Sequence, residues 1–453
     1  MSSLPAPSDD LLALAEGLVA RARPGEQVEA YCARSHTTTV RAYQSEVESL
    51  TQATTAGVGI RVVTEGRQGF AYAGTLDAGV LDETLADARD NAAFGQFDEA
   101  NGLAEPDGVA AADLDLYRAR LADVAPATKV DLALALEQAV RDRDPRIRNV
   151  PNAIYSDGMG EAALASSTGL AAFDRSTSCY LSVEALAGEG DELQTGYGVG
   201  VGRDLDDLDL ETVAVEAVER ATRLLGARQP ASRRLTVVLE PSVTAAFLAI
   251  IAGTLNGEAV LKGRSLFADR LGQPVGAASL TLVDDATEAR SPGATRYDGE
   301  GLACRPTVLI DGGVLQGFLH DTWSARKAGV ASTASAVRGY SSTPSVGAHA
   351  LAVQPGALTP EALLAQVGEG FLVQTVTGLH SGVNPVSGDF SVGAAGLMIR
   401  DGELAEPVRE ATIASTLQRM LLDVVAVGSD LEWRPGGTGA VSLAIADVAL
   451  SGR

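Results

Sequence analysis

The segment that most constrains the fold is a glycine-rich stretch, residues 377–403, with the sequence TGLHSGVNPVSGDFSVGAAGLMIRDGE. Its pair Asp401-Gly402 separates two apolar runs. An Asp-Gly pair in this setting predicts a tight β-hairpin, because the primed turns need residues that tolerate positive φ. The turn-rich part before it predicts a compact loop that leads into strands. Loops held on a sheet often carry function, so this stretch is a candidate site.

The chain of 453 residues is long enough for two or three domains, each with its own core. Changes in composition near 95–112 and at Gln229–Ser232 divide it into an N-terminal α/β domain (1–110), a middle α+β region (111–229) and a β-rich C-terminal domain (230–453). We expect an α+β fold: helices packed on antiparallel sheets, with flanking helices around a sandwich-like or barrel-like C-terminal unit.

Apolar periodicity and capping residues predict the individual elements. The expected helices begin near Asp9 (capped by Ser8), Thr128, Asp209 and Val243, and two more cover 357–366 and 412–427. Short strands are expected at 28–33, 37–43, 47–53 and 57–63, with a hairpin turn at Glu65-Gly66. Further short strands separated by turns are expected over 150–200, with one of the turns at Asp157-Gly158. The segment 441–450 is expected to be a buried strand.

Charge and cysteine content exclude several classes of protein. The formal net charge is −24, and no basic cluster longer than Arg233-Arg234 occurs, so we expect no nucleic-acid binding. No apolar run reaches the roughly 18–20 residues that span a bilayer, and the first residues lack a signal-peptide pattern, so we expect a cytoplasmic protein. Three separated cysteines argue against a disulfide framework and against a cysteine-only metal site.

Catalytic motifs are weak. There is no HExxH and no G-x-S-x-G, and the four histidines have no metal-ligand spacing. A metal site built from His320 and His380, with Cys304 or Glu258 as the third ligand, would need tertiary convergence. The alternative is that these histidines have structural roles or lie at the surface.

One family resemblance covers nearly the whole chain. The residues that carry it are Asn384–Ser391 (NPVSGDFS), the 399–403 hairpin, Val427–Leu431 (VGSDL), Gly263–Phe267 and Asp298–Gly301. With these motifs the chain resembles the PmbA/TldE proteins, the partner subunits of the TldD/TldE metalloprotease family, also called modulators of DNA gyrase.

The resemblance singles out the segment after an expected apolar helix. At this place TldD-type subunits carry HExxxH, whose two histidines bind zinc. Here the two histidine positions hold Gly257 and Lys262, and only Glu258 remains. Glycine has no ligating side chain, and a lysine ammonium has no lone pair for a metal. Glu258 and Lys262 are also four apart on a helix, the spacing of an ordinary ion pair, which is the structural interpretation.

The resemblance therefore implies a subunit that binds no metal and holds no cofactor, paired with a TldD-like chain that supplies the zinc. It implies degradation of unfolded or short peptides in an enclosed chamber, with this chain shaping the chamber wall. A homodimer of the isolated chain is a further expectation. Two alternatives stay open: an independent hydrolase with an unorthodox metal site, and a regulatory binding protein that acts on gyrase.

The resemblance also implies that the glycine-rich loop within residues 377–403 lies at the chamber rim or at the subunit contact. Its candidate residues are His380, Ser381, Asn384, Asp389 and Phe390. The alternative is that Asp389 only closes the turn through nearby backbone and that Phe390 belongs to the core.

Overall fold

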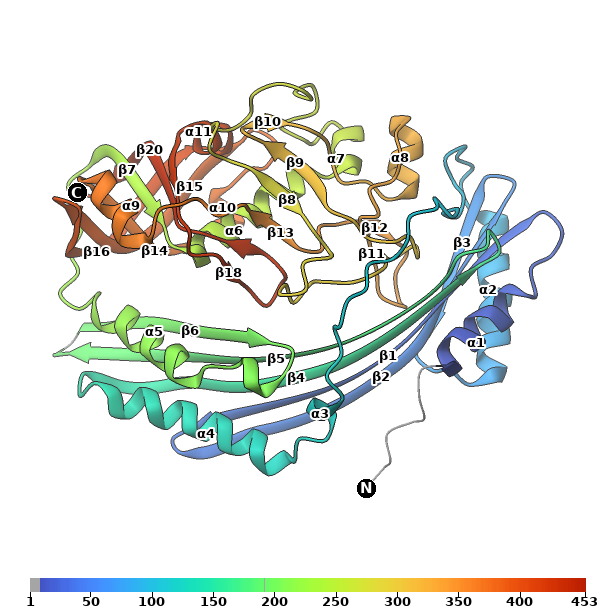
Figure 1. Ribbon diagram of the computed structural model, residues 1–453, viewed down its shortest axis with the longest axis horizontal. Helices are drawn as coiled ribbons and strands as arrows, with labels where there is room; N and C mark the ends of the chain where they lie inside the picture. The colour runs from blue at the N-terminus through green and yellow to red at the C-terminus, as the bar shows by residue number, and fades with distance from the viewer. Residues whose placement is uncertain (1–8, 191) are drawn as a thin grey trace.

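The computed structural model describes residues 9–190 and 192–453. Its first half is built on one antiparallel sheet of six strands in the order β3-β2-β1-β4-β5-β6, drawn as the long curved layer of Figure 1. The strands are β1 (Glu26–Tyr43), β2 (Glu46–Thr64), β3 (Arg67–Ala73), β4 (Ile147–Ser166), β5 (Ala171–Glu189) and β6 (Glu192–Gly202). At a rise of about 3.4 Å per residue, β1 alone is about 60 Å long.

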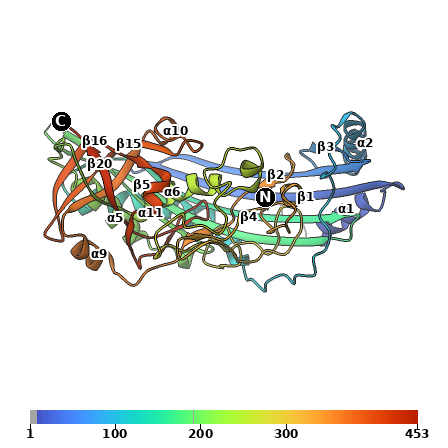
Figure 2. The ribbon, with the colours of Figure 1, turned by 90° about the horizontal axis from the view of Figure 1, so that it is seen from above.

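Helices cover one face of this sheet. They are α1 (Asp9–Val19), α2 (Ala78–Phe94), α4 (Pro126–Arg143) and α5 (Leu210–Thr222), and a short α3 (Ala119–Ala122) lies in the connection before α4. The even-numbered residues of β1 face the helices: Val28 lies in the core with α1 and α2, and Val40 lies in the core with α4 and α5. The odd-numbered residues, such as Glu29, therefore face the C-terminal domain. Seen from above, α1 and α2 lie at one end of the strands (Figure 2).

Several expected short strands are segments of longer ones. The expected strands 28–33 and 37–43 are both parts of β1, and the region 150–200 holds three long strands. The expected turn at Asp157-Gly158 was wrong, because both residues lie inside β4, which is paired with β1 on one side and β5 on the other. Pairing on both sides outweighs the local turn preference of this dipeptide. Ser8, the expected cap of the first helix, lies outside the described residues.

The C-terminal domain contains a closed barrel. Its sheet has the order β16-β15-β14-β7-β20-β17, and an additional pairing of β16 with β20 closes it. The strands are β7 (Arg233–Leu239), β14 (Gly370–Thr377), β15 (Asp389–Arg400), β16 (Glu403–Thr416), β17 (Val424–Val427) and β20 (Leu443–Ser451). The expectation of an α+β fold with a barrel-like C-terminal unit is confirmed.

A second six-stranded sheet and six short or medium helices complete this domain, and the apolar helix α6 (Pro241–Thr254) contributes Phe247 and Ile251 to its largest core. The strands are β8 (Leu282–Asp284), β9 (Thr307–Asp311), β10 (Val314–Leu315), β13 (Leu351–Val353), β18 (Glu432–Trp433) and β19 (Gly439–Ala440), and β11 (Ala336–Val337) pairs with β12 (Ser345–Val346). The remaining helices are α7 (Gly257–Leu261), α8 (Thr322–Ala328), α9 (Pro360–Val367), α10 (Leu379–Gly382) and α11 (Leu417–Leu422).

The expected helix over 412–427 was wrong. Residues 412–416 belong to β16, where Thr412 pairs with Ser451 to close the barrel, and only the six residues of α11 are helical. The side chain of Thr416 caps α11 by accepting a hydrogen bond from the backbone of Arg419, so the helix cannot extend backwards into the strand. The β-branched pair Val424-Val425 then returns the chain to a strand.

Residues from the first two expected domains share one sheet, since β1 from the first pairs with β4 from the second. The boundaries 1–110, 111–229 and 230–453 stay predictions. Among the residues that the structure describes, no helix is both long and apolar enough to cross a membrane.

Candidate functional site

The degenerate HExxxH position lies at the start of α7. The side chain of Asn256 caps this helix, accepting from the backbone N–H groups of Glu258 (2.8 Å) and Ala259 (3.2 Å). Its own amide nitrogen donates to the carbonyl oxygen of Val346 at 2.9 Å. Asn256 thus fixes where α7 begins and ties it to β12.

The space above Gly257 is filled by a histidine from another part of the chain. The backbone N–H of Gly257 donates to the carbonyl of Leu319 at 2.8 Å, which brings the segment before α8 against α7. A Cβ atom on residue 257 would lie 2.2 Å from both Cε1 and Nδ1 of His320. No side chain fits at residue 257 unless the imidazole moves.

His320 is held firmly in this place. Its backbone N–H donates to Thr333 Oγ1 at 2.7 Å, and its ring atom Nδ1 lies 3.1 Å from Ser324 Oγ. Burial disfavours the charged ring and lowers the pKa of His320, although the nearby carboxylate of Asp321 partly opposes this shift. The imidazole is therefore neutral at neutral pH and acts as packing above Gly257.

Glu258 and Lys262 form an ion pair with each other across one turn of the helix. Their side chains are 34% and 49% exposed, so the pair is solvated and contributes little to stability. Gly257 and Lys262 offer zinc no ligand atom, and Glu258 is engaged by the lysine. The residues at this position do not fit a zinc ion.

The other candidate metal ligands are scattered. His380 lies exposed on α10, whereas His320 is buried beside α7 and Cys304 is buried with its thiol directed at the carbonyl of Ala334. Within 9–190 and 192–453, no three His, Cys, Asp or Glu side chains are placed to hold a metal ion together. The structure does not bring the alternative ligand sets together.

The candidate loop between α10 and β15 is a tight, exposed turn. Asn384 organises it: its side-chain oxygen accepts from the backbone N–H groups of Val386 (2.9 Å) and Ser387 (3.2 Å). Ser387 Oγ in turn donates to Asp389 Oδ2 at 2.6 Å. His380 and Ser381 are exposed on α10, and Ser381 Oγ bonds back to the carbonyl of Gly378.

Phe390 points the other way, into the core. It is 3% exposed and meets Phe247 of α6 edge-on, with ring centroids 6.3 Å apart. For these two residues the geometry agrees with the structural alternative: Asp389 is bonded within the turn, and Phe390 lies in the core. The exposed side of the loop, which carries His380, Ser381 and Asn384, is free to take part in a contact; its role at a rim or interface stays a prediction.

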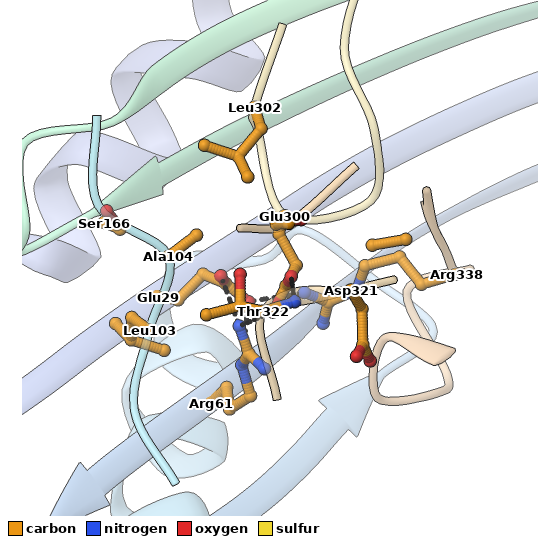
Figure 3. A network of polar contacts seen from close by, with 12 residues as sticks. Glu29, Arg61, Leu103, Ala104, Ser166, Glu300, Leu302, Asp321, Thr322 and Arg338 are labelled. Atoms are coloured by element: carbon orange, nitrogen blue, oxygen red, sulfur yellow. Dashed lines mark hydrogen bonds and ion pairs between the residues drawn. The ribbon is translucent and has the colours of Figure 1, made fainter. Parts of the chain in front are cut away.

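A buried charge cluster joins the sheet to the C-terminal domain (Figure 3). Of its members, the sequence indicated only Glu300, as part of the family motif Asp298–Gly301. Glu29 of β1 and Arg61 of β2 are directly opposite each other, and Arg61 makes two bonds to Glu29 (2.8 and 3.1 Å) and one to Glu300 (3.2 Å). Glu29 is also paired with Arg338. Two carboxylates and two guanidinium groups cancel in charge, as buried ions must.

The electrostatics of this cluster favour the ionised forms. Burial alone would raise the pKa of Glu29, but the charges of Arg61 and Arg338 outweigh it and lower that pKa. Glu300 accepts a further hydrogen bond from the backbone N–H of Thr322 (2.8 Å), at the start of α8. The cluster thereby connects the sheet to the segment that positions His320.

Next to the cluster, a cavity of about 260 Å³ separates the sheet from the C-terminal domain. Its lining includes Tyr31 and Asp174 from the sheet and Asp298 and His349 from the C-terminal domain. Burial, and next the charge of Glu300, raise the pKa of Asp298 to about 7, although three backbone N–H groups oppose this shift. In the sequence Asp298 stands out only as part of a family motif. No pattern in the neighbouring residues indicates that it lies on a cavity wall.

A second cavity, of about 310 Å³, shares Tyr31, Asp174 and Thr295 with the first, so the two adjoin. Interfaces between domains are among the places where small-molecule sites preferentially occur, so this space is a candidate ligand site.

Comparison with known proteins supports the resemblance seen in the sequence. Three family models match in chain order: PmbA/TldA metallopeptidase domain 1 over residues 28–92, the central domain over 119–225 and the C-terminal domain over 232–452. The chain belongs to the PmbA/TldD metallopeptidase family. Within that family it stands with the PmbA/TldE members.

Two relatives illustrate the similarity. The metalloprotease PmbA homolog of Haemophilus influenzae is 31% identical over 411 residues, which cover 89% of this chain and 88% of the relative. Metalloprotease PmbA of Escherichia coli O157:H7 is 29% identical, with 86% and 84% covered.

Solved structures confirm the fold. TldE from Thermococcus kodakarensis superposes with a TM-score of 0.89 at 21% identity, covering 98% of this chain and 99% of that one. A putative modulator of DNA gyrase from Bacteroides thetaiotaomicron gives a TM-score of 0.87 at 27% identity, covering 98% and 100%.

Proposed function

We propose that this chain is the non-zinc subunit of a heterodimeric TldD/TldE-type peptidase. A TldD-like partner would supply the zinc and its HExxxH helix, and the pair would degrade unfolded or short peptides in the cytoplasm. Within the complex this chain would shape the chamber and position substrate.

The observation that carries the proposal is the imidazole of His320 above Gly257. A zinc-binding histidine at residue 257 would need the volume that this ring occupies, since even a Cβ atom would lie 2.2 Å from it. The second histidine position holds Lys262, whose ammonium group is paired with Glu258. Both ligand positions of a TldD-type site are therefore used for packing and ion pairing in this chain.

The cavity between the sheet and the C-terminal domain supports the part of the proposal that concerns substrate. Its walls come from both domains and carry aromatic rings beside polar groups, such as Tyr31 and Tyr297 beside Asp298. Such a lining suits a peptide segment, which offers apolar side chains and backbone polar groups together.

The test is peptidase activity on an unstructured peptide, with metal analysis of the same samples. This chain is measured alone and mixed with the TldD-like protein of its organism. The matched control is a mixture in which the partner's HExxxH glutamate is replaced by glutamine, which removes the general base and leaves the zinc ligands. We expect zinc and activity in the first mixture, zinc without activity in the control, and neither in the isolated chain. Chelator-sensitive activity with stoichiometric zinc in the isolated chain would refute the proposal.

A further inference from the structure

A cavity of about 350 Å³ lies at one end of the C-terminal barrel. The last residue of the chain, Arg453, is part of its lining, so it lies at the end marked C in Figure 1. Met398 of β15 and Val408 of β16 also line it, and both belong to the largest core of the domain. Arg233 of β7 lies directly opposite Leu450 of that core, so the two share the inner face of the barrel. The cavity is therefore the mouth of the barrel, a place where small-molecule sites preferentially occur.

The charge at this mouth is opposite to the charge of the chain. Residues 220–239 hold five arginines and no acidic residue, although the chain as a whole carries −24. Three of the five are held in ion pairs with carboxylates: Arg220, Arg223 and Arg234. The other two, Arg228 and Arg233, line the cavity. Among the residues that the structure describes, none forms a side-chain hydrogen bond or an ion pair with either guanidinium group.

Two glutamates lie near the mouth, but both are already bound. Arg400 donates to Glu369 at 2.8 Å and to Glu406 at 2.7 Å. These bonds from Arg400, and more weakly the charge of Arg233, lower the pKa of both carboxyls, so both are ionised at neutral pH. The guanidinium groups of Arg228, Arg233 and Arg400 are three positive charges against these two negative ones, and the two that Arg400 leaves free are donors without an acceptor.

The rim of the cavity is fixed before any ligand arrives. The backbone N–H of Arg228 donates to the carbonyl of Pro407, and the backbone N–H of Arg409 donates to the carbonyl of Arg228, both at 3.2 Å. This linker thus runs beside β16 as a short bridge. Gln229 adds a bond from its side chain to the carbonyl of Glu410 at 3.3 Å. A preformed rim loses little conformational freedom when a ligand binds.

We propose that the mouth of the barrel binds a small dianion, a phosphate monoester or a dicarboxylate, whose negative charges meet Arg228 and Arg233. A guanidinium group presents its N–H donors in a planar fork that matches the oxygens of phosphate and of carboxylate. Two such groups without partners match two negative charges. The apolar part of the lining, which includes Met398, Pro407 and Val408, takes the apolar body of the ligand.

Isothermal titration calorimetry of the full-length chain tests this site at constant ionic strength with three probes that share an aromatic ring: phenyl phosphate, phthalate and benzoate. A phosphate monoester is a dianion above its second pKa of about 6, phthalate has two carboxylates and benzoate has one. We expect phenyl phosphate or phthalate to bind at millimolar concentrations or below, and the tighter of the two identifies the ligand chemistry. Benzoate should bind about tenfold more weakly or worse. If neither dianion binds, or if benzoate binds as tightly as they do, the proposal is overturned.

Charge-removing variants locate the binding. Arg228→Gln and Arg233→Gln should each weaken the better dianion about tenfold or more, because each loses a charge-assisted hydrogen-bonded pair. Arg234→Gln is the matched control: it removes the same charge from the next residue, which is paired with Asp447 and lies outside the cavity lining, and it should leave the affinity unchanged. Unchanged affinity in both cavity variants, or an equal loss in the control, refutes the assignment. This outcome is independent of the zinc-free role proposed above, which rests on metal content and peptidase activity.

Discussion

Replacing Gly257 by alanine measures how tightly His320 fills the degenerate site. The new Cβ would lie 2.2 Å from the ring, and ordinary contacts begin near 3.4 Å, so the ring or the helix must shift by about 1.2 Å. Overpacking of this kind costs about 1–3 kcal/mol. His320 has little freedom to yield, because it is buried and bonded to Thr333 and Ser324.

This close approach predicts that the effects of substitutions at Gly257 and His320 are coupled. On a His320→Ala background the ring is gone, so Gly257→Ala should cost about 1–2 kcal/mol less than in the parent chain. Some cost should remain, because the carbonyl oxygen of Leu319 would still lie 2.7 Å from the new Cβ. The four proteins of the cycle are compared by urea unfolding.

The matched control is Gly253→Ala near the end of α6, where a Cβ meets nothing within 4 Å. It should be neutral or stabilising, since alanine favours a helix over glycine by up to about 1 kcal/mol, and it should show no coupling to His320→Ala. If Gly257→Ala costs the same with and without the imidazole, the ring does not occupy the vacated ligand position and the argument for a zinc-free site loses its main support.

Two further predictions concern the buried charges. Arg61→Met should lower the free energy of unfolding by about 3–5 kcal/mol, because it leaves Glu29 buried with one partner fewer, whereas Arg234→Met, which removes an exposed pair, should change little in the same denaturation assay. Asp298 has a pKa raised to about 7 when folded, from an ordinary value near 3.8, so the folded state binds the extra proton between these pH values. Stability should therefore fall as pH rises through this window, by at most about 1.4 kcal/mol per unit, and Asp298→Asn should flatten that slope; an unchanged slope would place the proton elsewhere.

The features that were predictable from sequence are those that depend on a few neighbouring residues. Asp401 and Gly402 have φ of 51° and 82°, and Glu65 and Gly66 have 48° and 73°, so both expected hairpins form with the left-handed residues that primed turns need. Asp209 caps α5 as expected, accepting from the backbone of Thr212.

The features that sequence reasoning missed depend on contacts between distant segments. The expected helix over 412–427 fails because Thr412 pairs with Ser451 to close the barrel, which no local pattern records. The imidazole above Gly257 has the same origin, since His320 reaches it from the segment before α8. A glycine and a lysine in place of two histidines indicated a lost site, but the group that fills the space could not be read from the chain.

The charge cluster explains why the sequence did not indicate that a second face of the sheet is buried against the C-terminal domain. Glu29 and Arg61 lie on odd positions of strands whose even positions are apolar, an alternation that ordinarily means one buried face and one in water. Here the charged face is buried as well, because Glu300 and Arg338 of the C-terminal domain complete a set of four charges with no net excess. Removing any one member leaves an unbalanced buried charge, so a sheet covered by an unmatched surface would carry a penalty of several kcal/mol. Charge matching in this cluster therefore helps to fix how the C-terminal domain packs on the sheet, and the bond from the backbone of Thr322 to Glu300 links the cluster to the segment that carries His320.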